Sequence, residues 1–283
     1  MDVTLTEVEA GGRTFTVRSC GPADGRPVLL LHGFPQTSAC FTRELLSLGR
    51  AGFRAVAPDQ RGYSPGARPG AVGEYRVDAL VADVVALSDA LGWERFDLVG
   101  HDWGGLVAWT VAGWHPGRVR TLTAVSTPHP AALAAALDGG DPDQAQRSSY
   151  VDLFRQVDVP EQLLLGEDGS GSGLRQLFAD SGIEEPVAAS YVEVLRQPGA
   201  LTAALHWYRA NDLRAPAATG PITVPTLYAW STDDIALGRQ AAETTAGYVD
   251  GPYRFEVLQD VNHWIPDVAA EQLSGLLIDH LGA

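Results

Sequence analysis

The feature that most constrains the fold is a short segment, residues 96–105, in which an apolar run leads into a lone carboxylate between glycines. Residues 96–99 are typical of a buried strand, and the residues from Leu106 onward are typical of a helix. Between them, residues 100–104 read Gly-His-Asp-Trp-Gly, which is the Gly-x-nucleophile-x-Gly spacing of a nucleophile elbow. Glycines are needed there because only residues without a Cβ fit where strand and helix backbones approach closely. The central residue is Asp102, where Ser or Cys is more familiar.

The rest of the chain alternates strand and helix patterns. The predicted strands are residues 3–9, 13–18, 28–31, 53–57, 96–100, 119–126, 224–230 and 253–258. The predicted helices between and after them are residues 41–50, 75–91, 103–115, 239–248 and 268–281. This alternation predicts an α/β fold with an eight-stranded, mostly parallel, doubly wound sheet.

One long stretch interrupts the alternation. After the sixth predicted strand, the chain shows helical patterns and Gly-rich loops without a convincing strand. We therefore expect a core made of residues 1–127 and 220–283, with a helical cap, residues 128–219, inserted after the sixth strand. Because open α/β sheets bind ligands at the carboxyl ends of their strands, this cap should cover the site.

Composition narrows the functional classes. Hydrophobic residues make up 45% of the 283 residues, so the chain can bury a sizeable core. A net charge of −15 argues against nucleic acid and anionic membranes as partners. The chain lacks a membrane-length apolar run and a signal peptide pattern, and Cys20 and Cys40 are interpreted as free thiols. We expect a cytoplasmic monomer or homodimer that uses no metal and no cofactor.

Two further catalytic candidates follow later strands. Asp233 and Asp234 come at the end of the seventh predicted strand, and His263 follows the last one. The chain order of nucleophile, acid and histidine is the order found with a nucleophile elbow. On spacing alone, either aspartate could be the acid.

An aspartate nucleophile favours displacement at saturated carbon. With an ordinary pKa of about 3.9, Asp102 is ionised at neutral pH and needs no base to activate it. Its attack on an acyl group would give a labile anhydride, whereas its attack on an sp³ carbon gives an ester. His263 is then free to activate the water that hydrolyses this ester. The backbone N–H groups of Phe34 and Trp103 are the expected oxyanion donors.

The leaving group separates the candidate reactions. A halide departs as a stable anion, whereas an epoxide opens to a basic alkoxide that needs a proton donor. A tyrosine hydroxyl, protonated at neutral pH, can supply that proton. The cap contains Tyr150, Tyr191 and Tyr208.

With these residues in place, the chain resembles the α/β-hydrolase superfamily and, within it, the epoxide hydrolases. The resemblance covers nearly the whole chain. The motifs that carry it are His-Gly-Phe-Pro at 32–35, Asp-Gln-Arg-Gly-Tyr-Ser at 59–64, Gly-His-Asp-Trp-Gly-Gly at 100–105, His-Trp-Tyr-Arg at 206–209 and Asn-His-Trp at 262–264.

The resemblance implies roles for individual residues. A Trp-Tyr-Arg segment and a tyrosine near the start of the cap carry the ring-opening hydroxyls in epoxide hydrolases, which implies Tyr208 and Tyr150. Tyr191 lacks such a context and is interpreted as packing. The acid precedes an apolar residue in the family, which favours Asp234. The Phe34–Pro35 peptide bond is expected to be cis.

The implied activity is the opening of a small apolar epoxide to a vicinal diol through an alkyl ester on Asp102. The ester would then be hydrolysed by water that His263 and Asp234 activate. We expect the substrate to contact a set of mostly aromatic side chains: Phe34, Pro35, Trp103, Phe154, Trp207 and Trp264.

Other reactions remain open on the same scaffold. Haloalkane dehalogenases share the Asp-Trp pair and the ester, but they usually carry Asn or a second Trp where this chain has Phe34. Fluoroacetate-type dehalogenases place Arg where this chain has Trp103. A small-molecule binding or cyclisation protein without hydrolytic activity is a further alternative, which the intact set of Asp102, Asp234 and His263 argues against. The missing Ser disfavours ordinary ester hydrolysis.

Overall fold

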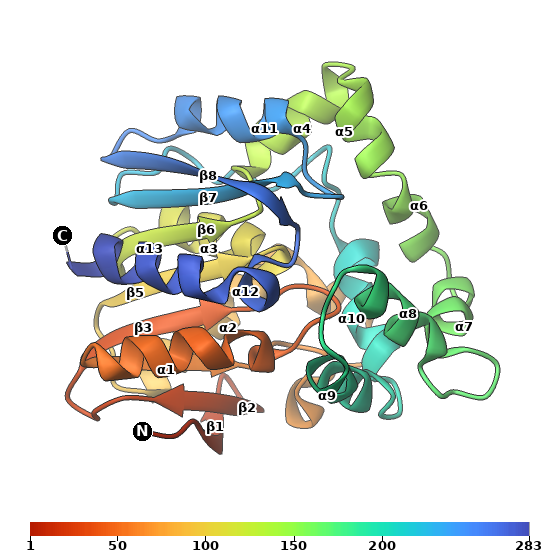
Figure 1. Cartoon of the computed structure of the whole chain (residues 1–283), viewed down its shortest axis with the longest axis horizontal. Helices are drawn as coiled ribbons and strands as arrows, with labels where there is room; N and C mark the ends of the chain where they lie inside the picture. Colours follow the sequence, from red (N-terminus) through yellow and green to blue (C-terminus); the bar gives the residue numbers. More distant parts are fainter. Residues whose placement is uncertain (283) are drawn as a thin grey trace.

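The buried apolar runs of the sequence form the middle of one eight-stranded sheet in the computed structural model, which describes residues 1–282 (Figure 1). The order across the sheet is β1-β2-β4-β3-β5-β6-β7-β8. β2 pairs antiparallel with β1 and β4, and all other neighbours are parallel. The strands are β1 (Thr4–Ala10), β2 (Arg13–Cys20), β3 (Arg26–Leu31), β4 (Phe53–Pro58), β5 (Phe96–His101), β6 (Val119–Val125), β7 (Thr226–Asp233) and β8 (Tyr253–Asn262). The predicted mostly parallel sheet is confirmed.

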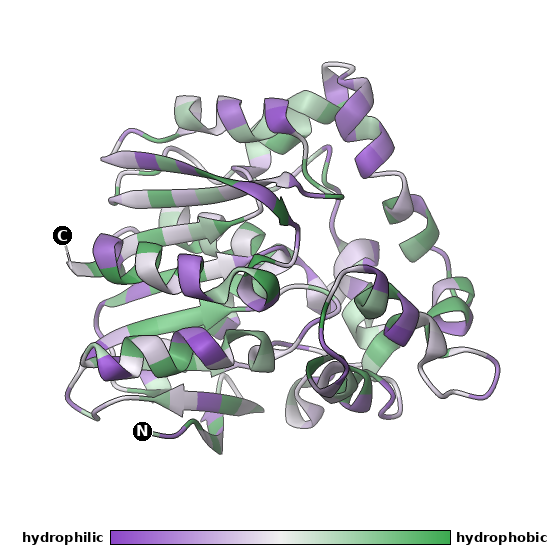
Figure 2. Cartoon of the chain, in the orientation of Figure 1, coloured by the Kyte–Doolittle hydropathy of each residue, from purple (hydrophilic) through white to green (hydrophobic). Residues whose placement is uncertain are grey.

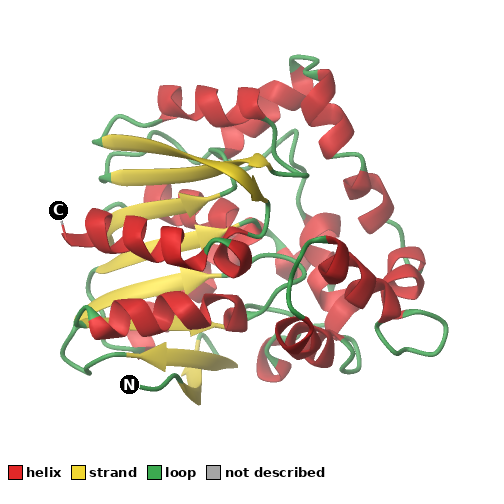
Figure 3. Cartoon of the chain, in the orientation of Figure 1, coloured by secondary structure: helices red, strands yellow, loops and turns green. Residues whose placement is uncertain are grey.

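Helices cover both faces of this sheet, with α1 and α13 on one face and α2 and α3 on the other (Figures 1 and 3). The helices of the core are α1 (Thr42–Arg50), α2 (Val77–Ala90), α3 (Trp103–Trp114), α11 (Arg239–Thr244), α12 (Ile265–Val268) and α13 (Ala270–Gly282). Short 3₁₀ turns are η1 (Ser38–Phe41), η2 (Pro65–Ala67), η3 (Val72–Tyr75) and η4 (Thr245–Tyr248). This arrangement explains why central strands are continuously apolar.

Every residue of β5 is buried, as are the last four residues of β3. Figure 2 shows these central strands as hydrophobic, whereas α1 and α13 carry alternating hydrophilic and hydrophobic bands. A parallel strand that is covered on both faces reads as an unbroken apolar run, while a helix at the surface needs only one apolar face. No helix among residues 1–282 is both long and apolar enough to cross a bilayer.

The helical insertion predicted after the sixth strand is present between β6 and β7. Its helices are α4 (Pro130–Asp138), α5 (Pro142–Arg147), α6 (Tyr150–Phe154), α7 (Val159–Leu165), α8 (Ser172–Asp180), α9 (Glu185–Leu195) and α10 (Ala200–Ala210). The first of them, α4, packs against the core, because Leu133 and Leu137 share an apolar cluster with Leu237 and Ala241. The helices α6 to α10 lie beyond the carboxyl ends of the strands (Figure 1).

Candidate active site

Asp102 stands at the tight turn between β5 and α3, where the sequence predicts an elbow. Its φ of 51° and ψ of −122° lie in a region that L-residues rarely adopt. A Cβ on Gly104 would overlap the carbonyl of Leu31, and a Cβ on Gly33 would overlap the Asp102 carboxylate itself. Glycines at these two positions therefore let the loops after β3 and β5 approach each other closely around the carboxylate.

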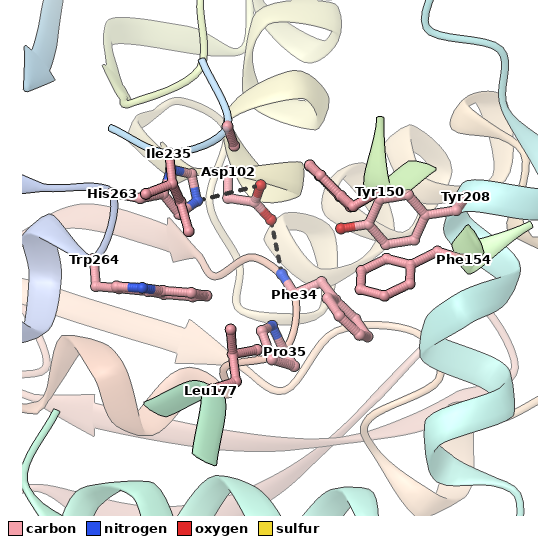
Figure 4. Close-up of a pocket in the computed structure, with 11 residues that line it drawn as sticks. Phe34, Pro35, Asp102, Tyr150, Phe154, Leu177, Tyr208, Ile235, His263 and Trp264 are labelled. Atoms are coloured by element: carbon pink, nitrogen blue, oxygen red, sulfur yellow. Dashed lines mark hydrogen bonds and ion pairs between the residues drawn. The ribbon is translucent and has the colours of Figure 1, made fainter. Parts of the chain in front are cut away.

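The Asp102 carboxylate lies between a backbone donor and an imidazole. Its Oδ1 accepts a hydrogen bond of 2.8 Å from the N–H of Phe34. Its Oδ2 lies 3.6 Å from Nε2 of His263. The Phe34–Pro35 peptide bond is cis, as expected from the sequence. Figure 4 shows the carboxylate at the centre of this arrangement.

His263 is oriented by Asp234 and not by Asp233. The His263 Nδ1–H group donates to Oδ2 of Asp234 over 2.9 Å. The other Asp234 oxygen accepts from the N–H groups of Ala236 at 2.8 Å and Leu237 at 2.9 Å. Asp234 is fully buried, whereas Asp233 is exposed at the end of β7. Of the two aspartates that the spacing left open, only Asp234 contacts the histidine.

The main chain of His263 is held by two side chains that the sequence did not single out for this purpose. Its carbonyl accepts from Nε2 of His101 at 2.9 Å and from Oγ of Ser126 at 3.1 Å. Burial lowers the pKa of His101 to about 4, so the ring stays neutral and acts as a hydrogen-bond donor. The position of His101 directly before Asp102 was the signal that could have identified it.

The charges of this group stabilise one another. Burial opposes the charge on Asp102, but the hydrogen bond and charge of His263 outweigh it and hold the pKa of the carboxyl below its usual value. Burial likewise opposes the imidazolium form of His263, but the charges of Asp234 and Asp102 outweigh it and raise its pKa to about 10. With no substrate bound, Asp102 is therefore an anion paired with a cation.

Two tyrosines face Asp102 from the insertion, on the side opposite His263 (Figure 4). Tyr150 begins α6 and Tyr208 lies near the end of α10, with their ring centroids 6.1 Å apart. Burial and the Asp102 charge raise the pKa of the Tyr150 hydroxyl, and burial with neighbouring Tyr150 and Asp102 raises that of Tyr208. Both hydroxyls therefore remain protonated. Tyr191 instead donates to Asp267 over 2.8 Å.

Two arginines connect α10, which carries Tyr208, to the neighbouring helices α6 and α7. Arg155, which follows α6, donates through Nε to the carbonyl of Tyr208 at 3.1 Å. Arg209, next to Tyr208, donates to both oxygens of Glu161 on α7, each at 2.9 Å, and this ion pair is nearly buried. The spacing between the tyrosines thus depends on contacts between segments about 50 residues apart.

Asp102, His263 and the two tyrosines line one cavity of about 200 Å³ at the carboxyl ends of the strands (Figure 4). Its lining residues are Phe34, Pro35, Asp102, Tyr150, Phe154, Leu177, Tyr208, Ile235, Ala236, His263 and Trp264. Apart from Asp102 and His263, none of these side chains is charged. The sequence did not predict Leu177, Ile235 or Ala236, although Ile235 directly follows the acid and its adjacency was a usable signal.

Comparisons with known proteins agree with this geometry. Residues 26–270 match the family model described as alpha/beta hydrolase fold. The chain is 33% identical to the AB hydrolase superfamily protein YfhM of Bacillus subtilis, over 97% of this chain and 96% of that protein. It is 31% identical to Epoxide hydrolase 4 of Mus musculus, over 89% of this chain and 72% of that protein. This chain belongs to the epoxide hydrolase-like α/β hydrolases. A solved structure of epoxide hydrolases from metagenomes of hot environments superposes with a TM-score of 0.88 at 29% identity, covering 99% of both chains.

Not every predicted substrate contact of this hydrolase reaches the cavity. Phe34, Pro35, Phe154 and Trp264 line it, but Trp103 and Trp207 are not among the lining residues within the described part of the chain. The Trp207 indole N–H donates to the carbonyl of Arg61 at 3.0 Å. The Trp103 ring packs edge-on against Tyr208, with centroids 4.9 Å apart. The two indoles therefore pack behind the residues that line the cavity near α10 and do not line it themselves.

A metal site in this hydrolase would need a cluster of side chains that could bind the ion. Among residues 1–282, no group of three or more His, Cys, Asp or Glu side chains is arranged to hold a metal ion.

Proposed function

We propose that this hydrolase opens small apolar epoxides to vicinal diols through a covalent ester on Asp102. One observation carries the proposal: a single cavity brings the Asp102 carboxylate together with Tyr150 and Tyr208 on one side and His263 on the other. An anionic nucleophile, two protonated donors for an alkoxide and a base for water are the groups that this reaction needs.

In the first step, Oδ2 of Asp102 attacks an epoxide carbon, because Oδ1 is already bonded to the Phe34 N–H. The carbon–oxygen bond of the ring breaks, and its electron pair goes to the epoxide oxygen. That oxygen takes a proton from Tyr208 or Tyr150. Their raised pKa keeps both tyrosines protonated until this moment, and the neutralised Asp102 then makes a nearby tyrosinate less unfavourable.

Forming the ester also prepares the second step. The Asp102 charge is one of the causes that raise the pKa of His263, so its loss lowers that pKa. The imidazolium then gives its proton, through solvent, to the tyrosinate formed in the first step, which leaves a neutral imidazole and a neutral tyrosine. His263 then takes a proton from water, which attacks the ester carbonyl. The oxyanion forms at Oδ1, where the N–H groups of Phe34 and Trp103 stabilise it.

Collapse of this intermediate restores the starting groups. The diol oxygen leaves with the proton from His263. The proton of the regenerated Asp102 carboxyl passes to His263, which restores the pair of carboxylate and imidazolium. Water and epoxide are consumed and only the diol is released.

The size and the lining of the cavity favour a small, apolar substrate for this reaction. Its walls are mostly aromatic and aliphatic, and a small cavity of this kind selects by shape. We assign the reacting carboxylate to the core, residues 1–127 and 220–283, and the proton donors to a cap formed by residues 128–219.

The geometry gives less support to dehalogenation. A halide needs N–H donors in the cavity, and the Trp103 indole instead packs against Tyr208. Phe34 contributes its backbone N–H to Asp102 and has no side-chain donor.

Intact-protein mass spectrometry on His263→Gln tests the proposal. The variant keeps Asp102 but cannot activate water, so the ester should accumulate. We expect a mass gain equal to that of a whole aryl epoxide, mapped to Asp102, and no gain with Asp102→Ala. A gain of only the alkyl group from a haloalkane, with no epoxide adduct, would favour dehalogenation. Tight binding of either probe without an adduct would favour a binding protein.

A further inference from the structure

A short helix of the insertion, α5, contacts the loop that carries the acid Asp234. Gln144 on this helix is fully buried. Its Oε1 accepts from the N–H of Gly238 at 2.8 Å, and its Nε2 donates to the carbonyl of Ala236 at 2.9 Å. A second Nε2 bond, 2.9 Å long, goes to Oγ of Ser148. One amide thus bridges two main-chain groups of a loop more than 90 residues away.

A second side chain of α5 contacts the same loop. Arg147 donates through Nη1 to the carbonyl of Asp234, the acid itself. Its Nε donates to Asp143 at 2.8 Å, which fixes the guanidinium on the helix. Gln144 and Arg147, which we call the α5 clip, therefore hold the loop at both ends, at residue 234 and at residues 236–238.

Bonds within the core hold part of this loop, and α5 bonds three of its main-chain groups. Residues 234–238 connect β7 and α11 and belong to neither element, with bends at residues 235–237. The same five residues supply the carboxylate that orients His263 and, through Ile235 and Ala236, part of the cavity wall. A loop whose main-chain groups are bonded by a buried amide has fewer conformations available to it than one bonded by water.

We propose that the α5 clip positions Asp234, so that Gln144 and Arg147 are positioning residues for the second chemical step. The inference rests on the proposed function. Ester formation depends on Asp102, which is held by the elbow and by Phe34, and needs no contact with the clip. Ester hydrolysis depends on His263, whose orientation follows that of Asp234. Loosening the clip should therefore slow hydrolysis and spare ester formation.

The test compares Gln144→Met, Arg147→Met and the control Gln146→Met in the full chain, with His263→Gln as the benchmark. Methionine keeps the volume of these side chains but removes their hydrogen bonds. Gln146 lies on the same helix, is exposed and uses its side chain in no bond with residues 1–282. A rapid-quench single turnover with an aryl epoxide, followed by intact mass, measures the rise and the decay of the Asp102 adduct separately.

We expect Gln144→Met to slow the decay of the adduct by about tenfold or more, because small displacements of catalytic groups cost up to about a hundredfold. The rate at which the adduct forms should change by less than about threefold, because Asp102 itself is not displaced. Arg147→Met, at a partly exposed position, should show the same pattern more weakly and stands in for Gln144→Met if that variant does not fold. The control should match the parent.

Each other result contradicts the inference. Unchanged decay in both clip variants, or equal slowing of rise and decay, would mean that α5 only supports the fold. If His263→Gln accumulates an adduct while the clip variants do not, the inference fails and the proposed function stands. If no variant forms an adduct, the proposed function fails and the inference fails with it.

Discussion

The two sides of the cavity are held by different kinds of contact. On the core side, main-chain groups position the reacting carboxylates: the N–H of Phe34 bonds Asp102, and the N–H groups of Ala236 and Leu237 bond Asp234. On the cap side, Tyr208 packs against aromatic side chains of both the cap and the core. The Tyr208 ring lies edge-on to three neighbours at centroid distances of 4.9 to 5.3 Å, namely Trp103, Phe154 and Phe34.

This difference has a physical consequence. A substitution changes a side chain but leaves the main-chain donors in place, so we expect the core side to tolerate most neighbouring substitutions, those of the α5 clip excepted. An aromatic wall changes shape with each substitution. We therefore expect the core side to determine the reaction class, and the cap side to determine which substrates reach it and how their oxygen is protonated.

The largest effect should come from the core side. Asp234→Asn keeps the shape of the acid but removes its charge, and we expect ester hydrolysis to slow about 10³- to 10⁴-fold, as with other triad acids. Ester formation should remain close to the parent rate. The Asp234 charge helps to raise the pKa of His263, so its removal lowers that pKa. The acid limb of the hydrolysis rate should then move to lower pH, measured by adduct decay at several pH values.

Asp233→Asn is the matched control, because Asp233 is the exposed neighbour of the acid. It should leave both steps unchanged. A large loss from this variant, with activity retained in Asp234→Asn, would reverse the assignment of the acid.

The next largest effect should come from the cap side of the cavity and should fall on ester formation alone. Tyr208→Phe removes a proton donor, and we expect ester formation from an epoxide to slow about 10²-fold, the usual contribution of a general acid. Tyr150→Phe should act in the same direction. The decay of an ester that has already formed should stay close to the parent rate, which rapid-quench mass spectrometry measures in the same experiment.

Tyr191→Phe is the control for this pair, since Tyr191 is a buried insertion tyrosine that contacts Asp267 and not the cavity. Its effect on ester formation should be small. Equal slowing of both steps by Tyr208→Phe would show that the ring holds the site together and does not donate a proton.

The sequence predicted the core side well because its residues follow local rules. The elbow glycines, the apolar parallel strands and the polar residues at strand ends each depend on backbone geometry near their own position. Asp102, His263 and Asp234 meet because the carboxyl ends of parallel strands share one edge of the sheet. The choice of Asp234 over Asp233 needed the family resemblance.

The cap side was harder to predict for a specific reason. Trp207 and Tyr208 are consecutive on a helix, so their side chains point about 100° apart and only one can face the cavity. Leu177 has no motif, and it reaches the cavity only because α8 lies where it does. The loop residues that Gln144 bonds are more than 90 residues away in the sequence. The periodic patterns used to predict helices and strands carry no information about contacts at that separation.

A buried carboxyl of the core that does not line the cavity should affect stability without affecting either chemical step. Glu44 on α1 is fully buried, and neither of its oxygens bonds another residue among residues 1–282. Burial raises the pKa of this carboxyl well above its usual value. The unfolded chain ionises it near pH 4.3, so its folded-state cost appears as the pH rises above that value.

Glu44→Leu should therefore raise the free energy of unfolding by about 1–3 kcal/mol near pH 8 and by less near pH 4. Urea denaturation at the two pH values measures this. Glu271→Leu, at an exposed position on α13, is the control and should change stability by no more than about 0.5 kcal/mol. A gain that does not depend on pH would mean that packing, and not the charge, is responsible.

The smallest effect should come from Ile235, which lies between the core side and the cap side of the cavity. Ile235 belongs to the core loop after β7, yet its side chain lines the cavity and is 57% exposed. Truncation in Ile235→Ala removes apolar contact worth about 1 kcal/mol at such a half-exposed site, so KM for an aryl epoxide should rise about three- to fivefold. A small alkyl epoxide should be little affected, and Val268→Ala, exposed outside this cavity, should match the parent. If Ile235→Ala instead slows ester hydrolysis, the residue acts with its neighbour Asp234, and the core side extends to the mouth of the cavity.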